Sequence, residues 1–398
     1  MNFHTGKFVI FISSLSLTNF RNYSQLDIDL PLGTTLIHGQ NGHGKSNLLE
    51  AIYMLAIAKS IRSSTERELI RKDTTNSVTY SKIAGFVEEK DKSTKLEIHY
   101  QCTPSGNEAG FTAQKYIRVN NSPKRSSALV GILNAVIFTV NDLDVVYGRP
   151  SDRRRYLDIL ISQVDKEYFK NLREYSKITT QRNHLLRLIR DRNASSSELE
   201  FWDEKLSLFG TTLINQRIQM VKKISSIAEQ IHRHMSSSNE TLNCLYQITT
   251  QSRTDTLLEV DSRIFKEKLK ECLTRDIAQG STSFGPHRDD LLLRINELDA
   301  NRYASRGQSR TAILSLKLAE AQFLQESRLS SPLLLLDDVL SELDAARQEK
   351  IAETIQNYEQ CIVTSVESES VPRSLFKNST VLEINHGTMI SNSATKEP

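Results

Sequence analysis

A glycine-rich stretch near the N-terminus has the residue types and spacing of a phosphate-binding loop. The apolar run Thr34–Ile37 precedes the pattern G-x-x-x-x-G-K-S at Gly39–Ser46, and a helix-like segment follows. Glycines let backbone N–H groups curl around a polyphosphate, and the helix N-terminus adds partial positive charge. Lys45 would reach the β- and γ-phosphates, and the Ser46 hydroxyl would ligate Mg²⁺. The residues predicted to hold ATP or GTP are Gly39, Gln40, Asn41, Gly42, His43, Gly44, Lys45, Ser46 and Asn47.

Two adjacent carboxylates follow a second apolar run and complete the predicted nucleotide site. Leu333–Leu336 has the character of a buried strand, and it ends in Asp337 and Asp338. In a phosphate-loop protein, an Asp at the tip of such a strand holds the Mg²⁺ shell, and the next acid can polarise the attacking water. We therefore assign catalytic roles to Lys45, Asp337 and Asp338, with Ser46 and Asp337 as Mg²⁺ ligands. Asp338 is one methylene shorter than the usual glutamate, which favours slow turnover.

Two further segments narrow the class of ATPase. Ala304–Gln308 reads A-S-R-G-Q before a helical pattern and resembles the L-S-G-G-Q signature of ABC-type ATPases, while Ser341–Asp344 lies where that class carries its D-loop. In that class the signature serine and glycine bind the γ-phosphate held by the other protomer, so a complete site needs two chains head to tail. The structural alternatives are a helix cap and a turn, but the order and spacing of the motifs favour the functional interpretation. The residues added to the nucleotide site are Ser305, Gly307, Gln308 and Asp344.

The remaining patterns predict the elements that position these motifs. Residues 8–37 alternate like two strands followed by the strand of the phosphate loop, and residues 78–120 resemble antiparallel hairpins. From about residue 151 the apolar spacing becomes helical and stays so as far as Leu188. Ser197 and Glu200 then resemble a capping box that opens a second long helix.

Together these patterns predict an α/β fold: an ABC-type P-loop ATPase head with an antiparallel β subdomain and an inserted helical arm. The head would consist of residues 1–150 and 281–398, and the arm of residues 151–280. A chain of 398 residues is long enough for more than one structural unit. Two paired helices of the predicted length span about 50 Å at 1.5 Å per residue, which is too short for a long coiled coil.

Composition argues against several other classes. The apolar fraction of 38% and the charged fraction of 25% are those of a soluble protein, and no run of about 18 apolar residues predicts a membrane span. The four cysteines are widely spaced without a C-x-x-C pair, which disfavours a zinc site or a disulfide framework and suits a reducing cytosol. We therefore expect a cytoplasmic protein with no membrane partner.

Several motifs resemble the RecF family of DNA replication and repair proteins. The resemblance covers Asn19–Tyr23, the phosphate loop and its helix at Asn41–Ile57, the segment Gly148–Asp158 and the quite specific G-P-H-R-D-D at Gly285–Asp290, before the signature and D-loop. These blocks span most of the chain in the family's order. The departures, all away from the phosphate loop, are Val140, Asn141 and Arg149.

The resemblance implies a function beyond nucleotide binding. Such a protein would bind ATP and Mg²⁺, form an ATP-dependent homodimer, and engage double-stranded DNA near gaps and single-strand/double-strand junctions. With RecR and RecO partners it would help RecA replace single-strand-binding protein. Hydrolysis would be slow and would reset the dimer.

A basic segment is the strongest candidate for contact with DNA. Between Arg149 and Arg192 there are twelve basic and six acidic residues, an excess of six against three for the whole chain. Such a segment suits phosphate contact with little base specificity. The alternatives are a solvated helix face or, for the arginine run, structural cations buried against the head. The predicted DNA-binding residues are Arg153, Arg154, Arg155 and, by family analogy, Lys59 and Arg62.

Two conspicuous side chains have simpler structural explanations. His287 stands without a second His or Cys nearby, which favours a hydrogen-bonded structural role over catalysis. Trp202 follows the apolar spacing of the second arm helix, so we expect it in the core of the arm rather than on a base-stacking platform.

The motifs are also compatible with other functions. An SMC- or Rad50-like DNA-tethering ATPase shares them, although the arm lacks a long heptad region and a C-x-x-C hook. A small-molecule P-loop kinase would need neither a signature nor a dimer. A transporter ATPase subunit is disfavoured by the long insertion and by Ser365, which stands where transporters have a switch histidine. A further alternative is a scaffold that binds ATP without turnover. For the loop alone, the alternative is a glycine-rich turn with a chance lysine.

Overall fold

The chain divides into two compact units, one with two sheets and the other with a small sheet of its own. The computed structural model describes residues 9–63, 65–72, 80–104, 111–236, 240–249, 260–367, 371–377 and 379–394. The head comprises Met1–Asn141 and Glu320–Pro398, and the arm unit comprises Asp142–Ala319. The sequence predicts that the head resumes at residue 281, whereas residues 281–319 group with the arm. The reason is that the strand beginning at Asp290 pairs with a strand of the arm unit.

A mainly parallel sheet forms the centre of the head. Its strand order is β15-β14-β3-β13-β12-β8, and its middle strands are β3 (Gly33–His38), β13 (Gln360–Ser365) and β12 (Leu333–Asp337). These strands pair in parallel and are largely buried, as expected for strands covered on both faces. The outer strands are β8 (Ala135–Phe138), β14 (Ser379–Asn385) and β15 (Thr388–Ala394).

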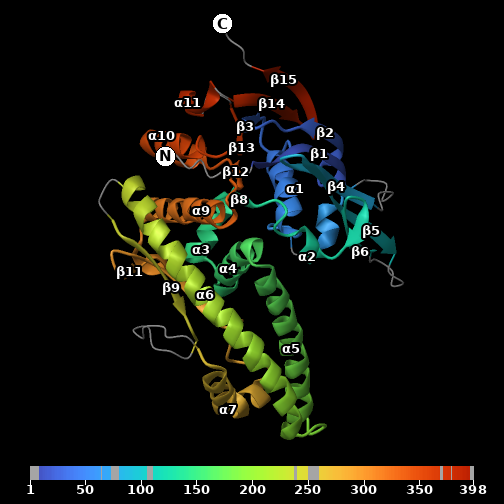
Figure 1. Ribbon diagram of the computed structural model, residues 1–398, viewed down its shortest axis with the longest axis vertical. Helices are drawn as coiled ribbons and strands as arrows, with labels where there is room; N and C mark the ends of the chain where they lie inside the picture. The colour runs from blue at the N-terminus through green and yellow to red at the C-terminus, as the bar shows by residue number, and fades with distance from the viewer. Residues whose placement is uncertain are drawn as a thin grey trace. The chain divides into compact units, whose positions relative to one another are not determined.

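Helix α1 (Lys45–Ile57) follows the phosphate loop directly and fills the core of the head. Most of its residues are buried, so it requires cover on every face. It contacts β12, β8 and β13 of the parallel sheet, and also β4 (Tyr80–Glu89) and β5 (Lys92–Pro104) of a second sheet. The helix therefore connects the phosphate loop to both layers of the head (Figure 1).

The second sheet of the head is antiparallel and has the order β2-β1-β4-β5-β6-β7. This confirms the predicted hairpins. The turn after β6 has positive φ at Asn120 (50°) and Asn121 (62°), which is the geometry of a tight hairpin turn. The strands not yet bounded are β1 (Ile10–Phe20), β2 (Tyr23–Asp29), β6 (Phe111–Val119) and β7 (Ser122–Lys124).

The arm unit is built mainly from helices. They are α4 (Pro150–Val164), α5 (Lys166–Arg190), α6 (Leu199–Met235) and α7 (Ser262–Gln279). Helices α5 and α6 pack along each other, and α7 contacts both (Figure 1). The unbroken helix predicted as far as Leu188 is wrong, because Asp165 separates α4 from α5. Its carboxylate accepts hydrogen bonds from the N–H groups of Glu167 and Tyr168, which caps α5.

The capping box before α6 also lies two residues earlier than predicted. The N–H of Ser195 donates to Oε1 of Glu198 over 2.8 Å, and Oγ of Ser195 accepts from the N–H of Ser197. The sequence S-S-S-E-L-E offers the same spacing in two frames, and the structure uses the first instead of Ser197 and Glu200.

The remaining elements complete the two units. The arm unit carries a small sheet of β9 (Leu242–Gln247), β10 (Asp290–Ile295) and β11 (Leu298–Asp299). Its short helices are α3 (Asp144–Tyr147) and α8 (Ala300–Tyr303), and α9 (Arg306–Arg328) begins in the arm unit. The head adds α2 (Ser126–Leu129), α10 (Ala345–Ile355) and α11 (Arg373–Phe376). In the part of the chain that the structure describes, no helix has the length and apolar character needed to cross a membrane.

Candidate nucleotide-binding site

The phosphate loop runs from β3 to α1, and its glycines adopt backbone conformations that other residues rarely reach. φ is +149° at Gly39, +83° at Gly42 and +116° at Gly44. At Gly39 a Cβ would lie 2.2 Å from the carbonyl oxygen of Ile384, so the close approach of β14 requires glycine there. The predicted ligand-binding residues Gln40, Asn41 and Gly42 are exposed, whereas Gly44 and Lys45 are buried.

Asn22, in the turn between β1 and β2, and Tyr23, at the start of β2, support the loop from beside it. Nδ2 of Asn22 donates to the carbonyl oxygen of His43 over 3.0 Å. The hydroxyl of Tyr23 donates to the carbonyl oxygen of Gly44 over 2.8 Å. Asn47 is in turn held by Oδ1 of Asn22, which accepts its amide at 2.8 Å. The motif at Asn19–Tyr23 thus fixes the phosphate loop, a role that sequence reasoning missed.

Lys45 turns its ammonium back onto the loop. Nζ donates to the carbonyl oxygens of Gly39 and Gln40, at 2.5 and 3.1 Å. Burial lowers the pKa of Lys45, and the nearby carboxylates of Asp338 and Asp337 act in the opposite direction. A desolvated cation held by backbone carbonyls beside an exposed glycine loop suits a polyphosphate.

Ser46 and Asp337 come together as the sequence predicts, although 291 residues separate them. Oγ of Ser46 donates to Oδ1 of Asp337 over 2.8 Å, and Oγ1 of Thr364 donates to the same oxygen over 3.1 Å. Burial raises the pKa of Asp337, and the hydrogen bonds from Ser46 and Thr364 offset part of that effect. Thr364 lies on β13, next to β12, and was not predicted.

This oxygen pair has the chemistry of a Mg²⁺ site completed by phosphate. The described residues contain no group of three or more His, Cys, Asp or Glu side chains placed to hold a metal ion. Mg²⁺ is typically bound through one or two carboxylates together with substrate phosphates and water. One carboxylate and one hydroxyl beside a phosphate loop therefore fit Mg²⁺ delivered with a nucleotide. Bound there, Mg²⁺ would neutralise phosphate charge, with Ser46 and Asp337 as its protein ligands.

Asp338 lies just past the tip of β12, in a left-handed backbone conformation with φ of 54°. Its N–H donates to Oγ1 of Thr364 over 3.0 Å, and its carbonyl oxygen accepts from Oγ of Ser341 over 2.8 Å. Both backbone groups are thus engaged, and the direction of the residue is fixed by its neighbours. Its role as the base that polarises water stays a prediction.

The signature segment forms the N-terminus of α9 in the arm unit. Oε1 of Gln308 accepts from the N–H of Ser305 at 2.8 Å, and Oγ of Ser305 accepts from the N–H of Gln308 at 3.2 Å. This reciprocal pair is a capping box, so the predicted structural alternative is present. Ser305 and Gly307 are nevertheless exposed, and a Cβ at Gly307 would meet nothing closer than 4.0 Å.

The predicted D-loop residue Asp344 caps α10 in the head. Its Oδ1 accepts from the N–H of Arg347 at 3.0 Å, and the Arg347 guanidinium pairs with its second oxygen. The hydrogen bond from that N–H lowers the pKa of Asp344. The carboxylate therefore has a local structural role, and its contact with nucleotide stays a prediction.

The predicted DNA contacts differ sharply in exposure. Arg153 is buried, donates twice to the carboxylate of Asp290 at 2.6 and 2.8 Å, and donates to the carbonyl oxygen of Gly148. Arg154 donates to the carbonyl oxygen of Asp289, and burial lowers its pKa. These contacts favour structural cations, whose partners are the Asp290 carboxylate and the Asp289 carbonyl oxygen of the arm unit rather than groups of the head. Half-buried Arg155 stays a prediction for DNA.

The two head residues predicted to touch DNA are both exposed. Lys59 and Arg62 lie in the segment that follows α1. Nη1 of Arg62 donates to Oδ1 of Asn47 over 3.1 Å, so this arginine is anchored to the helix that begins at the phosphate loop.

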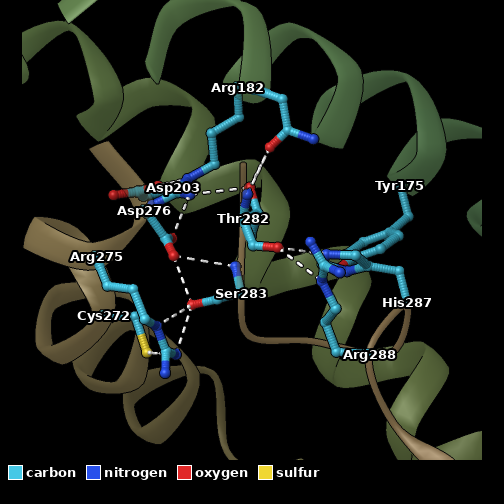
Figure 2. Close-up of polar contacts among 11 residues, drawn as sticks. Tyr175, Arg182, Asp203, Cys272, Arg275, Asp276, Thr282, Ser283, His287 and Arg288 are labelled. Carbon is cyan, nitrogen blue, oxygen red and sulfur yellow. Dashed lines mark hydrogen bonds and ion pairs between the residues drawn. The ribbon is translucent and has the colours of Figure 1, made fainter. Parts of the chain in front are cut away.

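Buried polar contacts link α5, α7 and the G-P-H-R-D-D segment of the arm unit (Figure 2). Arg182 is fully buried and donates to the carboxylates of Asp203 and Asp276, at 2.6 and 2.9 Å. The ring of His287 bonds the hydroxyl of Tyr175 and the carbonyl oxygen of Thr282, at 2.7 and 3.0 Å. Burial lowers the pKa of His287 to about 4, and the two hydrogen bonds are consistent with the structural role that the sequence predicts. Trp202 packs against an apolar cluster of the arm, also as predicted.

A second buried arginine engages the same segment. Arg217 of α6 donates to the hydroxyl of Tyr168, the carbonyl oxygen of Pro286 and the carboxylate of Asp158, at 2.8, 2.5 and 2.6 Å. Asp289 accepts from the hydroxyl of Tyr246 at 2.7 Å, and burial raises its pKa to about 6. The specific G-P-H-R-D-D motif therefore has a structural role, because it links α5, α6 and β9 within the arm unit.

Comparison with known proteins agrees with this geometry. The family model described as RecF/RecN/SMC N terminal domain matches residues 11–389. The DNA replication and repair protein RecF of Lachnoclostridium phytofermentans is 35% identical over 379 residues, which cover 95% of this chain and 99% of that protein. The chain belongs to the RecF family. RecF of Roseiflexus castenholzii is 37% identical over 370 residues, covering 89% of this chain and 93% of that protein.

Solved structures place this RecF-family chain among ABC-type ATPase heads. The structure described as the recombination mediator protein RecF-ATP in the RecFOR pathway matches with a TM-score of 0.86 and 32% identity, covering 98% of this chain and 99% of that one. The Smc head domain of Pyrococcus furiosus, at 17% identity and a TM-score of 0.53, shares the fold alone. The predicted family and fold class are thus confirmed.

Proposed function

We propose that this chain is an ATP-switched recombination mediator that binds Mg·ATP through the phosphate loop of its head. The observation that carries the proposal is the contact between Ser46 and Asp337 at 2.8 Å, directly beside the buried ammonium of Lys45. A hydroxyl, a carboxylate and a desolvated cation around a glycine loop are the groups with which a P-loop protein holds a phosphate-bound Mg²⁺. The solved RecF-ATP relative supports ATP rather than GTP as the nucleotide.

The proposal includes a homodimer that forms on ATP. The exposed start of α9, with Ser305 and Gly307, presents backbone N–H groups and a helix N-terminus, which suits the γ-phosphate held by a second copy. Asp344 would lie in the same interface as the D-loop. Because Asp338 is a short carboxylate with both backbone groups engaged, turnover would be slow and would reset the dimer.

The partner of the closed dimer would be double-stranded DNA near single-strand gaps. Lys59 and Arg62 offer exposed cations in the segment that follows α1, and Arg155 of the arm unit is a further candidate. RecR- and RecO-type mediators would then act with the complex in loading a RecA-type recombinase. The pathway named for the RecF-ATP relative supports this assignment.

A DNA-tethering role of the SMC or Rad50 kind is the rival function. Helices α5 and α6 have 25 and 37 residues, so they cannot form a long coiled coil. All four cysteines of the chain lie in described residues, each of them free and buried, so they offer no exposed C-x-x-C hook. The arm therefore favours a compact clamp over a long tether.

Sedimentation of the full chain with and without Mg·ATP and a gapped duplex tests the proposal. The wild type should dimerise only with Mg·ATP, and the dimer should hold the duplex more tightly. Lys45→Met should remain monomeric, Ser305→Arg should bind ATP without dimerising, and exposed Lys377→Met serves as the matched control. A wild type that stays monomeric and ignores DNA under every condition would overturn the proposal and favour a kinase-like role.

A further inference from the structure

A side chain outside the motif holds the signature segment at Ser305–Gln308. Nε2 of Gln308 donates to Oε1 of Glu240 over 2.8 Å, although 68 residues separate them. Glu240 lies between the end of α6 and the start of β9, so tertiary folding brings it to the first turn of α9. The capping box needs no third member, because Ser305 and Gln308 already bond each other. The contact with Glu240 is therefore an addition to the cap.

This contact decides which way the Gln308 amide points. A carboxylate only accepts hydrogen bonds, so the end of the amide that faces Glu240 is the NH₂ group. The amide oxygen then faces Ser305, whose N–H donates to it over 2.8 Å. The opposite orientation would bring two donors together at Ser305 and two oxygens together at Glu240. Glu240 therefore selects the one orientation in which the cap forms.

Glu240 is itself held beside the last turn of α6. Its side chain is only 11% exposed, and its second carboxylate oxygen lies 3.6 Å from Nε2 of His232. His232 is fully buried, and its Nδ1 lies 3.2 Å from Oγ of Ser315 on α9. The end of α6 thus reaches α9 at two points, through His232 at Ser315 and through Glu240 at Gln308.

The contacts that anchor the cap leave its functional residues open. Ser309 is buried, and its Oγ lies 2.7 Å from the hydroxyl of Tyr147. Gln308 is half-buried, whereas Ser305 and Gly307 are exposed. Fixing a segment before it binds lowers the entropy cost of ordering it on binding. The arrangement is therefore suited to presenting Ser305 in one fixed position.

We propose that Glu240 is a positioning residue of the signature segment, which orients the Gln308 amide and so fixes Ser305 for the γ-phosphate bound by a second copy. The inference deepens the proposed function and rests on it for the role of Ser305. Because Glu240 is held beside the end of α6, the signature depends on the arm helix as well as on its own residues. The phosphate loop belongs to the other unit, so ATP binding by the single chain does not depend on this contact.

Millisecond hydrogen–deuterium exchange of the full chain without nucleotide tests the positioning step. In Glu240→Ala, the Ser305–Gln308 segment should exchange about ten-fold faster, because the Gln308 amide loses the partner that orients it. Glu240→Gln should restore slow exchange, because its amide oxygen still accepts from Gln308. The matched control is Glu297→Gln, because Glu297 also accepts an amide, that of Asn243 at 2.9 Å, and this variant should exchange like the wild type. Unchanged exchange in Glu240→Ala would overturn the proposal.

Sedimentation with Mg·ATP tests the consequence for the dimer. The dissociation constant of the dimer should rise about 100-fold in Glu240→Ala, at about ten-fold for each of the two signature segments, and should stay near the wild-type value in Glu240→Gln and Glu297→Gln. The affinity of the monomer for a fluorescent ATP analogue should be the same in all four proteins.

The two measurements together separate the possible failures. Faster exchange with unchanged dimerisation, or a loss of ATP affinity alongside the loss of dimer, would overturn the positioning role. A wild type that does not dimerise with Mg·ATP would instead contradict the proposed function, and the exchange comparison would then decide by itself whether Glu240 positions the cap.

Discussion

The phosphate loop of the head and the arginine network of the arm unit both collect charged side chains, yet they use them in opposite ways. In the loop, Lys45 donates to the backbone carbonyls of Gly39 and Gln40, and Ser46 and Asp337 share a single hydrogen bond. In the arm, Arg217 is buried with every nitrogen of its guanidinium donating to protein oxygen. The charged groups of the loop are therefore placed to bind a ligand, whereas those of the arm network stabilise the fold.

The largest effect is expected from breaking the arm network. Arg217→Met should lower the free energy of unfolding of the arm unit by about 3–5 kcal/mol, because it leaves Asp158 without its buried partner. Urea unfolding followed by fluorescence measures this cleanly, since Trp202 of α6 is the single tryptophan of the chain. Arg233→Met on the same helix removes an exposed ion pair with Glu229 and should cost less than about 0.5 kcal/mol. Equal costs for both variants would refute the structural role.

The head should show the reverse pattern, a large loss of binding with little loss of stability. Lys45→Met should weaken ATP binding about 10- to 100-fold, as expected for a lost charge-assisted contact. The urea midpoint reported by Trp202 should not change, because Lys45 lies in the other unit. A calorimetric titration with ATP gives the affinity. An unchanged affinity would show that the lysine does not meet phosphate.

Two buried groups of the arm should give opposite pH effects. Burial raises the pKa of Asp289 to about 6, so its contribution to stability is present at low pH and lost as pH rises through 6. Burial lowers the pKa of His287 to about 4, so its contribution is present above about pH 6.5 and lost as pH falls toward 4. The two effects offset each other between pH 4 and 6 in the wild type.

Replacing Asp289 should reveal the pH effect of His287 on stability. Asp289→Asn should make the stability of the arm unit fall on acidification below pH 6.5, by up to about 1.4 kcal/mol per pH unit. The measurement is urea unfolding at several pH values, again followed by Trp202. A variant whose stability does not fall on acidification below pH 6.5 would contradict the buried, neutral state of His287, and a profile identical to that of the wild type would contradict the raised pKa of Asp289.

The smallest effect is expected at Thr364. Thr364→Val removes a hydrogen bond to Oδ1 of Asp337 and one from the N–H of Asp338, which should weaken Mg·ATP binding by about 1 kcal/mol. Without that donor the pKa of Asp337 rises further, so the loss should grow as pH falls. Thr354→Val on α10 removes a hydroxyl that bonds only its own helix and should leave binding unchanged. Binding that is insensitive to Thr364 would show that Asp337 is positioned by other contacts.

The nucleotide site was predictable from the sequence because each of its motifs is a short continuous segment. A strand, a glycine loop and a helix follow one another at Thr34–Ile57, and apolar residues lead directly into Asp337. Their supports were not predictable. Asn22 reaches the site from the turn between β1 and β2, and Tyr23 and Thr364 reach it from other strands. No spacing in the chain reveals which of these segments become neighbours.

The arm was predicted less well, for a physical reason. Its apolar period continues from α4 into α5, which hides the break at Asp165, and charge alone does not reveal burial at Arg153. The segment Gly285–Asp290 stood out as a motif, but its contacts come from α4, α5, α6 and β9. Long-range pairing decided the roles of these residues.

The most direct test of the account is the Mg²⁺ dependence of ATP binding at the Ser46–Asp337 pair. Titration calorimetry would compare the wild type and Ser46→Ala, each with Mg²⁺ and with chelator. The account predicts that Mg²⁺ tightens ATP binding by the wild type and that Ser46→Ala loses most of this gain while keeping its metal-free affinity. A wild type that binds ATP equally well with and without Mg²⁺ would contradict it.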